Sequence, residues 1–264
     1  MITSTRHPLV LTFRRLGDRT RRDPQRVLLD GPRLVADALD AGVMIETALV
    51  SAGATETRLA PLVARLREAG ARVHEASPRV VQAAGSVVTS QGIVAVAQRP
   101  AEADETILAA PDLLLLVADG IQDPGNLGTM IRAAAAAGAK VVATVGSATD
   151  PFQPKALRAS MGAAFRIPIM HGEAPRLRDA LAARGVRILV ADPHGTVEFT
   201  EAPLDPPVAI VIGNETGGPD PAWTPAGLRV RIPLYGPVES LNAAIAAAVL
   251  LYEAARRRAG EPRR

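Results

Sequence analysis

The chain has 264 residues, of which 48% are hydrophobic and 22% are charged, and its formal net charge is +3. This composition is typical of a globular protein and excludes a disordered chain. The longest uncharged apolar run, residues 243–252, is about half as long as a bilayer-spanning helix, which excludes a transmembrane protein. The chain has no cysteine, which excludes disulfides, thiolate catalysis and cysteine-ligated zinc.

The N-terminal segment is rich in arginine. Residues 1–26 contain seven arginines, at positions 6, 14, 15, 19, 21, 22 and 26, against Asp18 and Asp23. Such a segment suits an RNA phosphate backbone, and it is equally typical of a solvated, partly frayed terminus. The segment lacks the small-residue cleavage site of a signal peptide, so we expect a cytoplasmic protein.

The first part of the chain has the pattern of a small alternating α/β domain. We expect strands at residues 26–30, 45–51, 72–75 and 92–98. We expect helices from Pro32 to Ala41, from Glu56 to Ala69 and from Pro78 to Ala84, the first two followed by a terminating glycine. Two prolines and four acidic residues within residues 99–112 then predict a linker. This pattern gives an N-terminal domain over residues 1–99 and a linker over residues 100–111.

The second α/β pattern, over residues 112–264, is stronger. Continuous apolar runs at 113–118, 141–145, 187–191 and 208–212 are typical of parallel strands that are buried on both faces. We expect helices at 126–138, 154–161, 173–184 and 239–258 between and after them. The predicted fold is therefore α/β, with a parallel sheet in a C-terminal domain.

Three loops that follow strands are candidate ligand sites, because ligands of such sheets bind at the carboxyl ends of the strands. The loops are DGIQDPGNLG (119–128), GNETGGPD (213–220) and IPLYGPVESLN (232–242). The second loop has the glycine spacing of a P-loop, but Pro219 and Asp220 replace the lysine and hydroxyl residue that bind a triphosphate. Taken singly, each loop is also explained by glycines that only turn the chain.

These loops carry a resemblance to a known family. The segments NLGTMIRAA (126–134), VIGNETGG (211–218) and IPLYGPVESLNAAIAAA (232–248) resemble, in order, the three motifs of the SpoU/TrmH family. Its members are S-adenosylmethionine-dependent RNA ribose 2′-O-methyltransferases of the SPOUT superfamily. The segment DPFQPKALRASMGA (150–163) also resembles that family. STRHP and LLDGPRLV in the N-terminal unit are similar to the RNA substrate-binding domain that many members carry.

The resemblance implies a deep trefoil knot in the C-terminal domain and S-adenosylmethionine bound in a bent form by the knotted loops. It also implies a homodimer with its sites at the interface. The last helix would supply much of the contact through Leu241, Ile245, Ala248, Val249 and Tyr252.

The same resemblance implies the residues that bind the cofactor. Gly213 matches the glycine that lets the backbone approach adenosylmethionine, and Ile232 and Leu241 match positions that contact it. Gly218 and Leu234 are expected in the same pocket. Without the motifs, Gly213 would be a turn residue and the apolar side chains would be core residues.

Arg132 is the predicted catalytic residue, a cation within an alanine-rich helix. The resemblance implies that it acts on the ribose 2′-hydroxyl. Asn126 is expected to cap this helix and orient Arg132, and Glu215 to pair with it. Ser240 and Asn242 match the polar pair of the third motif, which suits the cofactor carboxylate or the target nucleotide. N-terminal capping of the last helix is the alternative for this pair, and it is compatible with a second role for Ser240. A solvent-facing arginine and ordinary helix caps are the alternatives.

The remaining composition predicts neither a metal nor a base-stacking platform. The four histidines are scattered, without carboxylates at ligand spacing, and the chain has seven aromatic residues. RNA recognition is therefore expected to depend on arginine, backbone and shape.

The N-terminal domain favours large-subunit ribosomal RNA over tRNA as the partner. A noncatalytic ribosome-associated RNA-binding module is the main alternative, and a nucleotide-dependent oxidoreductase is disfavoured by the missing glycine fingerprint. A housekeeping enzyme and an antibiotic-resistance enzyme share these sequence features.

Overall fold

The computed structural model describes residues 1–18, 23–53, 58–214 and 217–259. The chain forms two compact units. Unit 1 comprises Met1–Ala101 and Phe152–Phe165, and unit 2 comprises Glu102–Pro151 and Arg166–Arg264. The division differs from the sequence-based domains, because residues 152–165 pack with unit 1 although they lie within the second α/β pattern.

Unit 1 is built on a four-stranded sheet of order β1-β4-β2-β3. β2 and β3 are parallel, and β4 runs antiparallel to β1 and β2. The strands are β1 (Arg26–Asp30), β2 (Ile45–Ser51), β3 (Arg72–Ala76) and β4 (Ile93–Gln98). The helices are α1 (Pro8–Gly17), α2 (Pro32–Asp40), α3 (Ala60–Glu68), α4 (Pro78–Ala84), α6 (Pro154–Ser160) and the 3-10 turn η3 (Ala163–Phe165). The predicted start of α3 at Glu56 lies outside the described residues.

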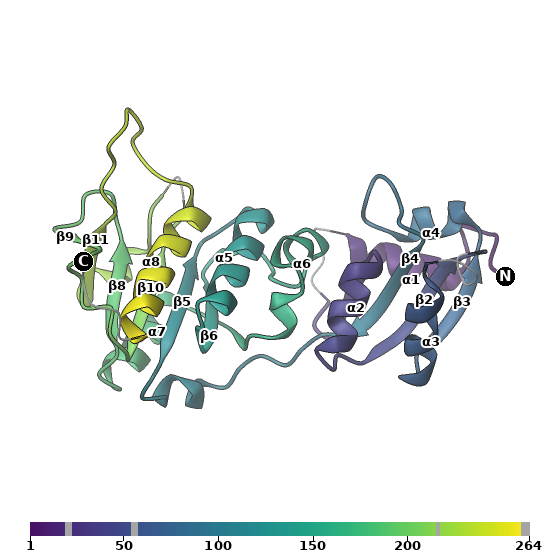
Figure 1. The fold of residues 1–264 in the computed structure, drawn as a ribbon, viewed down its shortest axis with the longest axis horizontal. Helices are drawn as coiled ribbons and strands as arrows, with labels where there is room; N and C mark the ends of the chain where they lie inside the picture. Colours follow the sequence, from purple (N-terminus) through teal and green to yellow (C-terminus); the bar gives the residue numbers. More distant parts are fainter. Residues whose placement is uncertain (19–22, 54–57, 215–216, 260–264) are drawn as a thin grey trace. The chain divides into compact units, whose positions relative to one another are not determined.

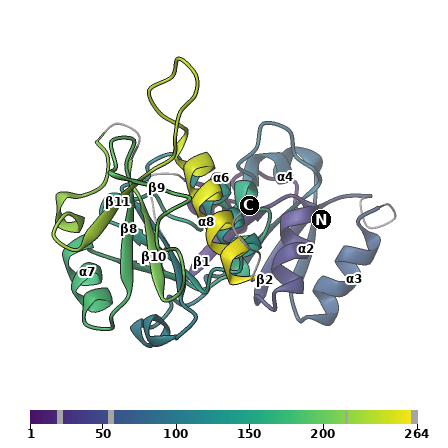
Figure 2. The same ribbon diagram turned by 60° about the vertical axis from the view of Figure 1, so that its left-hand side comes forward.

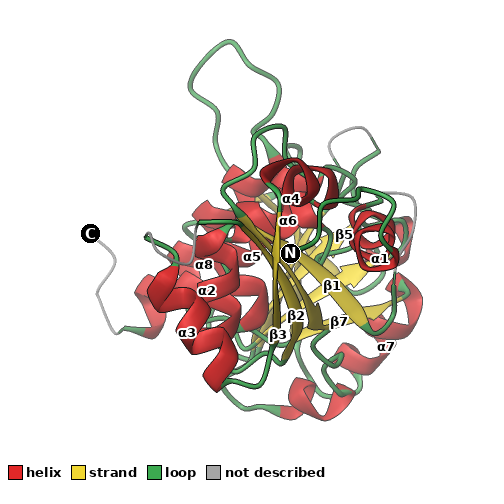
Figure 3. Ribbon diagram, turned by 90° about the vertical axis from the view of Figure 1, so that its right-hand side faces the viewer, coloured by secondary structure: helices red, strands yellow, loops and turns green. Residues whose placement is uncertain are grey.

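The helices of unit 1 cover both faces of its sheet. α2 and α3 pack on one face, and α1 and α4 pack against each other on the opposite face (Figure 3). Along β1, Leu28 contacts the α1–α4 side. Every residue of β1 after Arg26 is buried, as a strand between two helical layers requires.

Helix α1 corrects the expectation of a frayed N-terminus for residues 8–17. Pro8 starts the helix and His7 caps it, with Nδ1 accepting from the backbone N–H of Leu9 at 3.2 Å. Val10 and Phe13 have no exposed surface and belong to the core of unit 1. Arg14 and Arg15 remain exposed on the other side of the helix. Arg19, Arg21 and Arg22 lie outside the described residues.

The α6 segment is anchored within unit 1 by three kinds of contact. Arg158 donates to the Ser86 hydroxyl at 2.9 Å, and the Arg99 guanidinium lies 4.6 Å from the Phe152 ring centroid. At Gly162 a Cβ would lie 2.5 Å from the Asp37 Cβ, so this close approach requires glycine. These contacts are tertiary and leave no periodic signal in the sequence.

Unit 2 contains a seven-stranded sheet of order β7-β6-β5-β10-β8-β11-β9, in which every described pairing is parallel. The predicted α/β fold with a parallel sheet is confirmed, and the knot stays a prediction. The strands are β5 (Leu114–Asp119), β6 (Val141–Val145), β7 (Ile169–Gly172), β8 (Arg187–Ala191), β9 (Val197–Glu198), β10 (Val208–Ile212) and β11 (Gly227–Arg231). The helices are η2 (Glu105–Ala109), α5 (Pro124–Ala136), α7 (Ala174–Ala182), η4 (Pro221–Trp223) and α8 (Ala243–Arg258).

Two helical layers bury the strands of unit 2. α5 and α8 lie side by side against one face (Figure 1). Their alanine-rich surfaces permit close approach of the two backbones. On the other face, Leu115 and Val117 of β5 pack in one cluster with Leu177 of α7 and Leu108 of η2. Part of the predicted linker therefore contributes to the core of unit 2.

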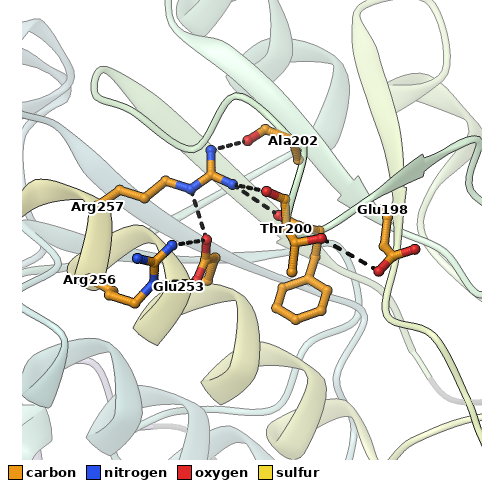
Figure 4. Close-up of polar contacts among 7 residues, drawn as sticks. Glu198, Thr200, Ala202, Glu253, Arg256 and Arg257 are labelled. Atoms are coloured by element: carbon orange, nitrogen blue, oxygen red, sulfur yellow. Dashed lines mark hydrogen bonds and ion pairs between the residues drawn. The ribbon is translucent and has the colours of Figure 1, made fainter. Parts of the chain in front are cut away.

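The C-terminal turn of α8 is tied to the segment after β9 (Figure 4). The Arg257 side chain is 8% exposed and donates to Glu253 at 2.9 Å and to the backbone carbonyl of Thr200 at 2.6 Å. Arg256 donates to the same carboxylate at 2.9 Å. Hydrogen bonds from Arg256, followed by those from Arg257, lower the pKa of Glu253 below its usual value. The bonds fix the helix end that lies farthest from the candidate site.

None of the helices in the described part of the chain has the length and hydropathy needed to cross a bilayer.

Candidate functional site

The candidate site lies at the carboxyl edge of the sheet in unit 2. β5 and β10 are parallel neighbours, and Ala118 is paired with Ile212. The next residues, Asp119 and Gly213, therefore leave the two strands at the same level. The first two candidate loops begin here, and the third, residues 232–242, follows β11 and extends away from the sheet (Figure 2).

A cavity of about 220 Å³ opens at this edge. Its walls come from four segments: the end of β8, the loop after β10, the end of β11, and the approach to α8. The lining residues are Ala191, Asp192, Pro193, Ile212, Gly213, Asn214, Gly218, Pro219, Val230, Ile232, Leu234, Ser240, Leu241, Ala243 and Ala246. The walls are mostly apolar side chains and backbone, which suits a flat, uncharged ring system.

Gly213 allows the backbone of residues 218–219 to pack directly against it at the cavity. A Cβ on this residue would lie 2.2 Å from the backbone nitrogen of Pro219 and 2.4 Å from the carbonyl carbon of Gly218. Both neighbours are backbone, so a rotamer change cannot relieve the overlap. Gly218 has a φ of +68°, which also favours glycine. The loop thus folds back on its own first residue.

All five residues predicted to bind the cofactor line this cavity, together with Ser240 from the predicted catalytic set. They are Gly213, Gly218, Ile232, Leu234 and Leu241. Their contact with a cofactor stays a prediction. Glu215 lies outside the described residues, so its predicted pairing with Arg132 cannot be placed.

Asn126 and Asn242 join the first and third motifs directly. The Asn242 side-chain nitrogen donates to the Asn126 side-chain oxygen at 3.0 Å. The Asn242 oxygen accepts from the backbone N–H groups of Ala244 and Ile245, which makes Asn242 the cap of α8. The predicted start at Glu239 is therefore wrong, and of the two residues suggested as caps, Asn242 caps the helix and Ser240 does not. Residues 239–242 lie in the loop before the helix.

The predicted capping role of Asn126 is also wrong. Asp123 caps α5, with its carboxylate accepting from the Asn126 backbone N–H at 2.9 Å, and the helix begins at Pro124. A proline at the first helical position is the usual sign of such a start. Arg132 lies two turns further along α5 and is exposed. The Asn126 side chain pairs with Asn242.

Two acidic residues at this edge were not predicted from the sequence. Asp192 lines the cavity; its carboxylate accepts from the His194 backbone N–H at 2.7 Å and pairs with Arg229 at 2.6 Å. Asp119 is 5% exposed and accepts from the Asp220 backbone N–H and the Trp223 indole. Burial raises the pKa of Asp119, and these two hydrogen bonds oppose the rise. A charged residue at the end of a buried apolar strand was the available signal for each.

The described residues contain no group of three or more His, Asp or Glu side chains that could hold a metal ion.

Comparison with known proteins identifies the family. Residues 113–252 match the model of the SpoU rRNA Methylase family, and residues 28–103 match that of RNA 2′-O ribose methyltransferase substrate binding. The chain belongs to the SpoU rRNA methylase family. The first match contains all three candidate loops, two of which line the cavity.

Similar sequences have names of the same kind. A 23S rRNA (guanosine(2553)-2′-O)-methyltransferase of Bacillus subtilis is 40% identical over 150 residues, which cover 56% of this chain and 60% of that protein. A 23S rRNA (uridine(2479)-2′-O)-methyltransferase of Streptomyces viridochromogenes is 37% identical, over 62% of this chain and 59% of that protein. The match thus spans about three fifths of the length of these curated relatives.

Solved structures of this family resemble the whole chain. An AdoMet-bound rRNA methyltransferase of Sinorhizobium meliloti superposes with a TM-score of 0.85 at 32% identity, over 97% of each chain. The SpoU methyltransferase AviRb of Streptomyces viridochromogenes, in complex with AdoMet, has a TM-score of 0.83 at 28% identity, over 97% of this chain and all of that one.

We expect Gly213→Ala to abolish measurable ligand binding in the cavity while the protein stays folded. The added methyl would push the Gly218–Pro219 backbone away and change the cavity wall. Isothermal calorimetry with S-adenosylhomocysteine, with Gly217→Ala as the control, measures the effect. A Cβ on Gly217 would meet no atom within 4 Å. Equal affinity of the two variants would contradict the packing argument.

Proposed function

We propose that this protein transfers a methyl group from S-adenosylmethionine to a ribose 2′-hydroxyl of large-subunit ribosomal RNA. The observation that carries the proposal is the cavity itself. Loops of the second and third family motifs form its walls, and the Asn126–Asn242 hydrogen bond joins the first motif to the third. The two curated relatives act, by their names, on 23S ribosomal RNA. A cytoplasmic location follows from such a substrate and belongs to the same proposal.

The cavity residues suit the proposed cofactor. Ile232, Leu234 and Leu241 offer apolar surface for an adenine ring, and the glycine backbone at 213 and 218 permits close approach. Ser240 would offer a hydroxyl to a polar end of the ligand. When bound, S-adenosylmethionine supplies an electrophilic methyl group on a sulfonium. This chain has to place a ribose oxygen in line with that methyl. Transfer would form the O–C bond, break the C–S bond, leave S-adenosylhomocysteine in the cavity and release the hydroxyl proton to water.

Arg132 would position the ribose oxygen. A guanidinium holds its protons too tightly to be a good general base, but it can hold a phosphate and the attacking oxygen at the same time. It would stabilise the negative charge that develops on the oxygen as the O–C bond forms and the C–S bond breaks. Arg132 is exposed on α5 and is therefore available to RNA. The start of α5 is hydrogen-bonded to the third motif through Asn126 and Asn242.

Unit 1 would bind the RNA. Arg14 and Arg15 are exposed on α1, whose opposite side is buried in the core. Removal of residues 1–25 would expose that core, because Val10 and Phe13 have no accessible surface. Point substitutions are therefore the proper test of these arginines.

We also propose a homodimer that uses the free side of α8. Ile245 and Tyr252, seven residues apart on one side of the helix, are 51% and 55% exposed, whereas Leu250, Leu251 and Ala254 are buried. Large apolar side chains on one helix face favour a contact with a second copy.

Mapping of ribose methylation in total RNA, with and without the gene, tests the proposed function. Loss of one 2′-O-methyl group from 23S ribosomal RNA is the expected result. Loss of a tRNA ribose methyl would support the tRNA alternative, and an unchanged map would support a noncatalytic RNA-binding module.

We expect Arg132→Ala to lower the rate of methyl transfer by ~10²–10³ with little effect on cofactor affinity, the effect typical of one preorganised donor. Arg132→Lys should recover little, because a point charge cannot hold two oxygens at once. Single-turnover transfer, cofactor titration and a thermal melt separate these effects. The melting temperature should stay near that of the wild type, since the side chain is exposed. Near-normal transfer by the alanine variant would exclude the role.

We expect the double variant Arg14→Gln, Arg15→Gln to weaken binding to a 23S ribosomal RNA transcript. The slope of log affinity against log salt should fall by about 1–2, because fewer counterions are released. The control is Arg65→Gln, Arg67→Gln, which removes the same charge from the exposed surface of α3. An equal loss in both double variants would show only an effect of net charge.

We expect the wild-type protein to scatter light as a dimer of its 27.5 kDa chain at micromolar concentration. Ile245→Glu with Tyr252→Glu should shift it to the monomer, because the charges would be buried in the contact. A wild-type protein that is already monomeric would contradict the proposed dimer.

A further inference from the structure

Asp119 is a buried acidic residue to which the proposed function so far gives no role. It is the last residue of β5, it is 5% exposed, and it lies outside the three segments that carry the family resemblance. β5 lies between β6 and β10, and the residues before Asp119 in the strand are apolar and buried. The carboxylate is therefore the first polar side chain that this strand presents at the candidate site.

The carboxylate binds the far end of the loop that forms one wall of the cavity. Oδ2 accepts from the backbone N–H of Asp220 at 2.6 Å and from the indole nitrogen of Trp223 at 2.9 Å. Trp223 is 1% exposed and is part of the core cluster of unit 2. One oxygen atom thus ties the chain just after Pro219 to the end of β5.

The neighbouring residue binds the near end of the same loop. The Asn214 side-chain nitrogen donates to the Gly120 carbonyl oxygen at 3.3 Å, and the Gly218 N–H donates to the Asn214 carbonyl oxygen at 2.9 Å. Asp119 and Gly120 together hold the loop at both ends. Between these ends, the backbone of Gly218 and Pro219 lies against Gly213, in a contact that leaves no room for a Cβ.

The position of Pro219 depends on both restraints. Pro219 has no N–H of its own to bond, and the next N–H in the chain, that of Asp220, is the one held by Asp119. Pro219, Gly218 and Gly213 all line the cavity. A displacement of Asp220 would therefore move a wall of the cavity, while the buried core below it stays in place.

A carboxylate is a costly group at this position. Burial disfavours the charged form of the carboxylate. Two hydrogen-bond donors compensate this cost, the Asp220 N–H and the indole of the core residue Trp223. An apolar residue would fill the end of a buried strand at lower cost, but it could not accept from the Asp220 N–H. That N–H would then lose the hydrogen bond that holds it in place.

We propose that Asp119 is a positioning residue for the cofactor cavity, which fixes the Gly218–Pro219 wall through the backbone of Asp220 and the indole of Trp223. This inference rests on the proposed function, because it takes the cavity to be the adenosylmethionine site. Asp119 does not line the cavity, so it acts through the loop and not on the ligand.

Three variants of the full chain test the role. Asp119→Asn keeps the shape and one acceptor oxygen but removes the charge that strengthens both hydrogen bonds. Asp112→Asn is the matched control, because Asp112 lies just before β5, at the opposite end from Asp119, and pairs with Lys140 at 2.7 Å. Trp223→Phe keeps a buried ring and removes one of the two donors.

The affinity for S-adenosylhomocysteine, measured by calorimetry, is the first readout. We expect Asp119→Asn to weaken it about 3–10-fold and Trp223→Phe about 2–5-fold, the effect of weakening or removing one such bond. Asp112→Asn should match the wild type. In methyl transfer, Asp119→Asn should raise the KM for S-adenosylmethionine and leave kcat and the KM for RNA unchanged, a pattern opposite to that of Arg132→Ala.

Fluorescence provides a second, local readout, because Trp223 is the only tryptophan in the chain. Its emission should change in Asp119→Asn and stay unchanged in Asp112→Asn, with similar melting temperatures for all. If Asp119→Asn bound S-adenosylhomocysteine as tightly as the wild type, or if Asp112→Asn lost as much affinity, the positioning role of Asp119 would be overturned and the proposed function would stand. A wild-type protein that does not bind S-adenosylhomocysteine would overturn the proposed function, and this role with it.

Discussion

The parallel pairing of β5 with β10 is the constraint on which the candidate site depends. Because Ala118 is paired with Ile212, the chain leaves both strands at one level, and Asp119 and Gly213 emerge beside each other. The loop after β10 can then be held by the end of β5, through Asp220 and Asn214. A shift of the register by one residue would turn Asp119 toward the opposite face of the sheet and remove this acceptor from the loop.

Much of the fold was predictable because parallel strands that are buried on both faces appear in the sequence as short, continuous apolar runs, which are recognised without any alternation of polar and apolar residues. The runs at 141–145, 187–191 and 208–212 are strands with the predicted bounds. Helix ends were predicted less well, because capping depends on one side chain among several candidates. Asp123 caps α5 where Asn126 was expected, and of the two candidates at the last helix only Asn242 caps it. Helix α1 was not predicted because residues 1–26 were interpreted by their charge, although Val10 and Phe13 belong to an apolar face within Pro8–Gly17.

The site was predictable where the chemistry is carried by local motifs and unpredictable where it is carried by tertiary contacts. The glycines and apolar residues of the second and third loops line one cavity, as their motifs led us to expect. Asp119 is separated from Asp220 by about a hundred residues, so no spacing in the sequence connects them. The packing of residues 152–165 with unit 1 is of the same kind, since Gly162 meets Asp37 only in the folded protein.

The hydrogen bond between Asn126 and Asn242 connects the helix that carries Arg132 to the wall of the proposed cofactor cavity. Asn242 starts α8 directly after Leu241, which lines the cavity, and Asn126 lies near the start of α5, the helix that carries Arg132. The close packing of α5 on α8 extends this link along both helices. Methyl transfer requires the attacking oxygen and the methyl carbon to be in line. The same rigid elements must therefore place both the arginine that positions the RNA and the walls that hold the cofactor. A direct bond between the first and third motifs meets that requirement, whereas an arginine carried on a separate loop would not.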